Sequence, residues 1–210
     1  TAGAVPIDIE ALAIDLLAFP GHKALLGLPV TGVLYVGPRA ELEPWREGGT
    51  GVFSEAPLQP ETLPLYLEAG SPNPFGVAGL RESLNFIQQY GVPWIRTHEM
   101  ALTRQLLDGL QAIDRVVVHG PASLEGRVAV VSITVRGMSV GAVAERLDRA
   151  HHIAVRSGLL CAPGTHRALG TFPDGTLRIS PGYFTSPGAI EACLEAIREA
   201  VGQAQEMLVT

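Results

Sequence analysis

A lysine that follows a short apolar run is the first residue of this sequence that could do chemistry. Residues 16–19 are apolar, and Pro20-Gly21 ends the run just before His22 and Lys23. An apolar run that stops at Pro-Gly is typical of a buried strand that ends in a turn. Lys23 is therefore expected at the mouth of a sheet, where ligand sites form. It is either an ordinary surface cation or a desolvated amine able to form a Schiff base.

A thiol and two guanidinium groups are the candidates in the second half of the chain. Cys161 lies in a loop bearing glycine and proline, after an expected strand that ends in Arg156. A thiolate near a guanidinium is reactive, whereas a buried loop cysteine is inert, and the sequence leaves both interpretations open. Arg178 lies in a short apolar strand and needs an anionic partner. A carboxylate held by the planar guanidinium fits best, and an internal salt bridge is the alternative.

Ser71 and Asn73 precede an expected helix N-terminus, which is a ready anion site, although capping of the helix is the simpler role. An amine, an anion site, a carboxylate-binding arginine and a thiol together suggest one chemistry. They suggest pyridoxal phosphate (PLP) acting on an amino acid whose side-chain sulfur or selenium is taken by a cysteine.

Composition limits the class of protein. The 210 residues are 47% hydrophobic and carry a formal net charge of -6, so a substantial core is expected and nucleic acid is not an expected partner. No apolar run reaches the roughly 18 residues of a membrane span, and the start has no basic region typical of a signal peptide. Two cysteines are too few for a disulfide framework, so a reducing cytoplasm is expected. No metal site is indicated.

Periodicity predicts the elements that position these residues. Helices are expected from Pro74 through residue 87, over residues 95–113, after Ser139, and after Ser186. Strands are expected at residues 16–19, 32–37, 116–119, 128–135, 153–156 and 176–180, and a long loop at 38–74. His98 and Cys193 lie on apolar helix faces and are expected in the core. The second part of the chain is therefore expected to be an α+β layer with helices against a mixed or antiparallel sheet.

Five segments in this order resemble the cysteine desulfurase and selenocysteine lyase branch of the class V aminotransferases, which have PLP fold type I. The segments are Gly21-His22-Lys23, Glu47-Gly48-Gly49-Thr50-Gly51, Glu68-Ala69-Gly70-Ser71-Pro72-Asn73, residues 155–162 around Cys161, and residues 177–184 around Arg178. The resemblance implies an α/β fold with a large PLP-binding domain and a small C-terminal α+β domain. Residues 1–75 would be the end of an incomplete large domain, and residues 76–210 the small domain.

The resemblance also implies roles for the cofactor-binding residues. Lys23 would hold PLP covalently and later move the α-proton, and His22 would contact the cofactor phosphate. Ser71 would reach the phosphate of the partner subunit, which implies a homodimer, and Thr50 would line the same shared site.

On the substrate side, the resemblance implies that Arg178, with Arg156 beside it, grips the carboxylate of cysteine or selenocysteine. Cys161 would take the sulfur as a persulfide and release alanine, and a sulfur-acceptor protein is a possible partner.

Departures from the family pattern set the remaining expectations. Pro20 stands where a phosphate-binding serine or threonine is common, and Leu160 where a histidine is often found. The chain is about half the usual length, so it is expected to be a C-terminal part with little activity alone. The alternatives are another class V PLP aminotransferase or lyase in which Cys161 is incidental, and a non-catalytic dimerisation or partner-binding fragment.

Overall fold

The computed structural model describes residues 1–209, with side chains described through residue 203. The chain forms two compact units, Thr1–Pro93 and Trp94–Thr210, called here the N-terminal unit and the C-terminal unit. No helix among the described residues has the length and apolar character needed to cross a membrane.

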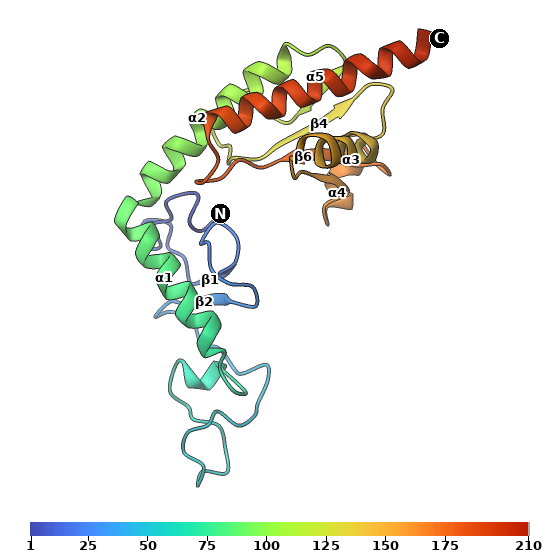
Figure 1. Cartoon of the computed structure of the whole chain (residues 1–210). Coiled ribbons are helices and arrows are strands. Elements are labelled where there is room, and N and C mark those ends of the chain that lie inside the picture. The colour runs from blue at the N-terminus through green and yellow to red at the C-terminus, as the bar shows by residue number, and fades with distance from the viewer. Residues whose placement is uncertain (210) are drawn as a thin grey trace. The chain divides into compact units, whose positions relative to one another are not determined.

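The N-terminal unit is built on a two-stranded hairpin and one long helix (Figure 1). Strands β1 (Leu16–Pro20) and β2 (Gly32–Val36) pair antiparallel, with Leu16 opposite Val36 and Pro20 opposite Gly32. The long loop that follows contains only a short helix, η1 (Leu65–Leu67), before α1 (Pro74–Tyr90). Both expected strands are confirmed. The expectation that the first is buried is wrong, because no third strand joins them in the described chain and Leu16 is 46% exposed.

Helix α1 begins and ends where its flanking residues dictate. The Asn73 side chain accepts a hydrogen bond from the Gly76 amide at 2.9 Å, and Pro74 occupies the first turn. Gly79 lets the helix approach the loop before β2, since a side chain there would come within 2.8 Å of Leu28 Cδ1. The compact unit that contains α1 ends at Pro93. The domain boundary expected at residue 75 stays a prediction.

The C-terminal unit is a four-stranded antiparallel sheet with the order β3-β4-β6-β5. Its strands are β3 (Val116–His119), β4 (Val131–Val135), β5 (Arg156–Gly158) and β6 (Thr176–Ile179). Its helices are α2 (Val92–Gln111), which begins just before the unit, α3 (Val140–His151), α4 (Pro163–Ala168) and α5 (Pro187–Val209). Figure 1 shows α2 and α5 running along the sheet.

One face of this sheet carries the core of the unit. Alternate residues of β4 are buried, as expected for a strand that presents one face to helices, and Leu177 and Ile179 of β6 lie on the same face. They pack with apolar residues of α2, α3 and α5 in one cluster, whose members include Leu106, Leu110, Ile133, Leu147, Leu177 and Ile197. The opposite face of the sheet carries polar side chains.

Two strand predictions in this unit have wrong boundaries. The strand expected at 128–135 begins only at Val131, because the Val130 amide bonds the Val128 carbonyl in a three-residue turn. The strand expected at 153–156 is displaced to Arg156–Gly158. Residue 153 instead completes the end of α3, where its amide bonds the Leu147 carbonyl after the left-handed His152. The short helices η1 and α4 were not expected from the sequence.

Candidate functional site

Lys23 lies in a closed turn directly after β1. The Gly21 amide bonds the Thr31 carbonyl at 2.9 Å, and the Gly27 amide bonds the Gly21 carbonyl at 2.8 Å. A third bond, from the Leu26 amide to the Lys23 carbonyl at 2.9 Å, closes the turn from inside. A side chain at Gly21 would collide with the Thr31 hydroxyl, so glycine is required there. The backbone that carries Lys23 is therefore well fixed.

The side chains of His22 and Lys23 are exposed on this turn. Within the described residues, neither side chain forms a hydrogen bond or an ion pair, so the Lys23 amine is accessible. Nothing in this unit desolvates it. Lys23 is also the only lysine in the 210-residue sequence.

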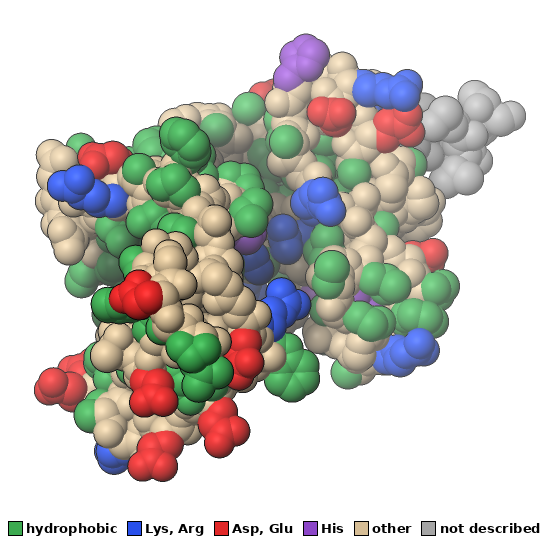
Figure 2. Space-filling view, turned by 90° about the horizontal axis from the view of Figure 1, so that it is seen from below, with side chains coloured by type: hydrophobic (Ala, Val, Ile, Leu, Met, Phe, Trp, Pro, Cys, Tyr) green, Lys and Arg blue, Asp and Glu red, His purple; other side chains and the backbone are tan. Residues whose placement is uncertain are grey.

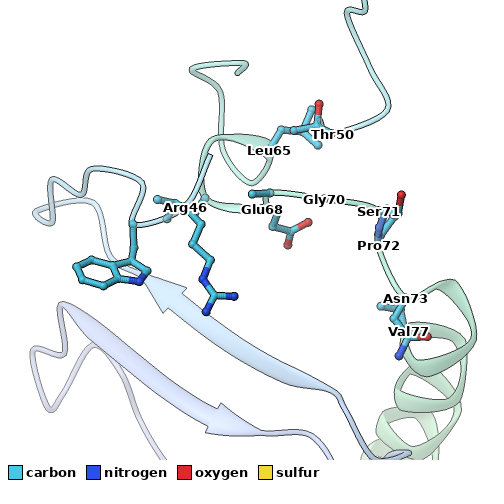
Figure 3. A pocket seen from close by; sticks show the side chains of 12 residues that line it. Arg46, Thr50, Leu65, Glu68, Gly70, Ser71, Pro72, Asn73 and Val77 are labelled. Carbon is cyan, nitrogen blue, oxygen red and sulfur yellow. The ribbon is translucent and has the colours of Figure 1, made fainter. Parts of the chain in front are cut away.

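Thr50 and Ser71 come from two glycine-containing loops that lie side by side. The Gly70 amide bonds the Gly49 carbonyl at 3.0 Å, which joins the loops. Both hydroxyl-bearing residues line a pocket of about 490 Å³ together with Arg46 and Glu68 (Figure 3). Asn73 also lines it, but its side chain caps α1, as the simpler interpretation expected.

Arg156 and Arg178 lie directly opposite each other on the antiparallel strands β5 and β6. Directly opposite residues share a face of the sheet, and two like charges in this position repel unless an anion lies between them. No carboxylate among the described residues forms an ion pair with either guanidinium. In addition, Nε of Arg178 is buried and has no hydrogen-bond partner. The internal salt bridge considered for Arg178 is thus not found in the described part of the chain.

Cys161 is an exposed thiol in the loop that follows β5. The Ala162 amide bonds the Leu159 carbonyl at 2.9 Å, and α4 begins at Pro163. The buried alternative for this cysteine is therefore wrong. Cys193 is buried in the core, as expected, and its burial raises the pKa of the thiol to about 11.

Several histidines differ from expectation or were missed. His98 is only half-buried, and its Nε2 lies 3.1 Å from the Thr185 carbonyl oxygen, so it is not a core residue. His119 lies 2.9 Å from the Thr134 hydroxyl on the polar face of the sheet. Burial, with a smaller effect from nearby His166, lowers the pKa of His119. Because side chains alternate between the two faces of a strand, the pattern of residues 116–119 could have placed His119 on this face. No cluster of histidine, cysteine or acidic side chains in the described residues could hold a metal.

The expected site residues thus fall into three groups, each held within one unit. His22 and Lys23 share the turn after β1, and Thr50 shares a pocket with Ser71. The third group is the opposed arginine pair with Cys161 in the loop after β5.

Comparison with known proteins gives a consistent result for family and fold. A family model described as Aminotransferase class-V matches residues 1–192. The chain is 34% identical to a probable cysteine desulfurase of Methanothermobacter thermautotrophicus over 206 residues, which is 95% of this chain and 51% of that protein. It is 35% identical to a cysteine desulfurase of Klebsiella pneumoniae, over 75% of this chain and 39% of that protein.

Solved structures agree with the sequence matches. The apo cysteine desulfurase of Thermococcus onnurineus superposes with a TM-score of 0.83 at 30% identity, covering 97% of this chain and 51% of that one. The Escherichia coli cysteine desulfurase CsdA gives 0.82 at 26% identity, covering 96% and 50%. The expected mixed α/β fold is confirmed, and the chain spans about half the length of the relatives it matches.

Proposed function

Because the chain belongs to the class-V aminotransferase family, we propose that it carries part of the machinery of a PLP-dependent cysteine desulfurase. The names of its relatives support cysteine as the substrate of the whole protein. A preference for selenocysteine stays a prediction. The observation that carries the proposal is the opposed pair Arg156 and Arg178, unpaired by any described carboxylate, in the same unit as an exposed thiol.

The residues present fit the cofactor. PLP needs a primary amine for covalent attachment and hydrogen-bond donors for its phosphate. Lys23 supplies the amine on a well-fixed turn, and Ser71 and Thr50 supply hydroxyls in one pocket. When bound, PLP withdraws electrons from the α-carbon of an amino acid.

Lys23 would hold the cofactor and, once displaced by the substrate amine, accept the α-proton at Nζ. His22, its neighbour on the same turn, would contact the phosphate. Pro20 at the end of β1 has neither a hydroxyl nor an amide hydrogen, so this chain supplies one phosphate donor fewer there.

We assign Ser71 and Thr50 to the cofactor phosphate of a second copy of the protein. Their pocket combines two hydroxyl-bearing side chains with the guanidinium of Arg46, a group that binds phosphate, and it also contains Glu68. The proposed assembly is therefore a homodimer with shared sites.

The arginine pair would hold the substrate carboxylate. A planar guanidinium can donate two parallel hydrogen bonds to a carboxylate, and a second cation opposite it adds attraction. An anion bound there also removes the repulsion between the two guanidinium groups.

Cys161 would act as the sulfur acceptor within the protein. Its thiolate attacks the substrate sulfur, an S–S bond forms, and the bond between sulfur and Cβ breaks with its electron pair left on carbon. Protonation of that carbon gives the methyl group of alanine, and Cys161 carries the persulfide. A thiol-bearing acceptor protein would then take the sulfur from this exposed position.

The single lysine gives a clean test of the cofactor assignment. The chain is incubated with PLP, reduced with borohydride, and mapped by peptide mass spectrometry. We expect a pyridoxyl adduct on the peptide that contains Lys23, at low yield for the 210-residue chain. The corresponding peptide of Lys23→Arg should carry none, and any adduct on the α-amino group is counted separately. An adduct confined to the α-amino group of Thr1 would overturn the assignment.

A second test addresses the carboxylate site without the cofactor. Cys161 lies within about 18 Å of Arg156 along the chain, so the arginines should favour iodoacetate over neutral iodoacetamide at this thiol. Near 10 mM ionic strength we expect Arg178→Gln to lower the ratio of the two alkylation rates roughly three- to tenfold. Arg104→Gln, on α2, is the charge-matched control. Equal ratios in all variants would contradict the carboxylate site.

The same chemistry separates desulfuration from other PLP reactions. In the whole protein, Cys161→Ala should stop sulfur delivery to a thiol acceptor. An aminotransferase in which Cys161 is incidental would keep its activity, and that result would contradict the proposal.

A further inference from the structure

Two unpartnered polar atoms lie on the same face of β6. The hydroxyl of Thr176 is buried without a hydrogen-bond partner in a residue that is only 1% exposed. Nε of Arg178 is buried and lacks a partner as well. Polar atoms left in this state are costly, and pairs of them at one place call for an explanation.

The two atoms are complementary in chemistry and close in register. Residues two apart on a strand point to the same face, and their Cα atoms are roughly 6.6 Å apart. A guanidinium Nε is only a donor, whereas a threonine hydroxyl can accept. A modest rotation of the long Arg178 side chain along the strand would bring Nε within reach of the Thr176 oxygen.

Of the other described groups that face Arg178, only one offers a hydroxyl that is not already engaged. Arg156 opposite it on β5 is a cation and accepts nothing. The Thr134 hydroxyl, on the same face of β4, already contacts His119 at 2.9 Å. Ser132, opposite Arg178 on β4, is half-buried and is the competing hydroxyl on this face of the sheet.

We propose that Thr176 is a positioning residue for Arg178. Its hydroxyl accepts a hydrogen bond from Nε when the guanidinium engages an anion, which directs the two terminal nitrogens toward the carboxylate. The inference rests on the proposed function of Arg178 and adds a residue that does not itself touch the substrate.

The ratio of iodoacetate to iodoacetamide alkylation at Cys161, in the 210-residue chain at low ionic strength, tests this role. Thr176→Val keeps the shape of the side chain and removes the acceptor, and we expect it to lower the ratio at least twofold. Thr176→Ser should retain the wild-type ratio. Ser132→Ala is the matched control and should also leave it unchanged. A stability change alone would alter both alkylation rates together and leave their ratio constant.

A second measurement keeps the inference falsifiable if the valine variant folds poorly. Lysine has no Nε–H in the guanidinium position, so in an Arg178→Lys background Thr176→Ala should produce no further fall in the ratio. Three results would overturn the role of Thr176. They are a further fall of the ratio in the Arg178→Lys background, an unchanged ratio in folded Thr176→Val, and a fall of the ratio in Ser132→Ala. If Arg178→Gln itself leaves the ratio unchanged, the carboxylate site of the proposed function fails, and the role of Thr176 fails with it.

Discussion

The two units of this chain differ sharply in how much apolar surface they bury. In the N-terminal unit only Leu25, Leu80 and Ile87 are buried hydrophobic residues, whereas the C-terminal unit buries entire faces of its helices and strands. The N-terminal unit instead exposes large apolar side chains, such as Trp45 at 93% and Leu58 at 78%. The C-terminal unit has a core of its own, and the N-terminal unit supplies loops with little core beneath them.

Charge follows the same division. The N-terminal unit has ten acidic and four basic residues, and the C-terminal unit has eleven of each. Residues 41–68 contribute six of those glutamates, interspersed with exposed apolar side chains, and Figure 2 shows acidic and hydrophobic side chains gathered together on one face. Large exposed apolar patches mark interaction surfaces, which agrees with the proposed homodimer.

Deleting a core side chain in each unit gives the largest expected difference. Leu106→Ala, at a side chain with 0% exposure, should cost about 4 kcal/mol of unfolding free energy because it leaves a cavity in close-packed surroundings. Leu80→Ala, at 8% exposure in the N-terminal unit, should cost about half as much, since less surrounds it. Urea unfolding followed by circular dichroism measures both. Equal losses would remove the distinction between the units.

Glycine substitutions test the packing of the loops. A side chain at Gly175 would collide with the Gly158 backbone, and the φ of +79° is also unfavourable for other residues. Gly175→Ala should therefore cost about 3 kcal/mol. At Gly49 nothing lies within 4 Å of an added Cβ, so Gly49→Ala should change stability by less than about 0.5 kcal/mol. Thermal melting of both variants checks the contrast, and a large loss at Gly49 would contradict it.

The core of the C-terminal unit should also limit stability at alkaline pH. Burial raises the pKa of Cys193 to about 11, above the value of about 8.5 in an unfolded chain. The folded state favours the protonated thiol, so this stability is fully present below about pH 8.5 and is lost as the pH rises toward 11. The loss should approach about 3 kcal/mol. Between pH 8 and pH 10.5, the urea midpoint should fall less in Cys193→Ala than in the unsubstituted protein. An equal fall in both proteins would contradict the effect of Cys193.

Matched helix caps give the smallest effects. Asn73 caps α1 in the N-terminal unit, and Ser139 caps α3 in the C-terminal unit through a 3.1 Å bond from the Ala142 amide. Replacing either by alanine should cost about 1 kcal/mol. We expect Ser139→Ala to lower the global unfolding free energy and Asn73→Ala to increase hydrogen exchange mainly in α1. Loss of protection across the C-terminal unit in Asn73→Ala would show that the units unfold together.

Local signals explain which elements could be predicted. The helices after Asn73, Ser139 and Ser186 were found because a cap and a 3.6-residue apolar period lie within one short stretch. The start of β4 was misplaced because a turn at Val130 decides it, and the alternation of apolar residues does not reveal that turn.

The roles of the candidate site residues stay predictions, and their grouping was implied by the family resemblance rather than by any local pattern. Lys23, Cys161 and Arg178 lie in sequence segments that resemble motifs of the family and follow one another in the same order. The opposition of Arg156 to Arg178 depends on the register of β5 against β6, which pairing across the sheet sets and no local pattern encodes. The contact between the loops of Thr50 and Ser71 has the same origin, since it joins glycines far apart in the sequence.

The loop before α4 places an evolutionary constraint on the thiol. Leu160 and Cys161 both adopt left-handed backbone angles, with φ of 52° and 61°, a region that costs a non-glycine residue about 1 kcal/mol. Glycine would relax position 161, so drift toward a more stable chain leads away from cysteine. A chain that keeps cysteine here retains a local backbone strain that glycine would relieve, next to the similar strain at Leu160.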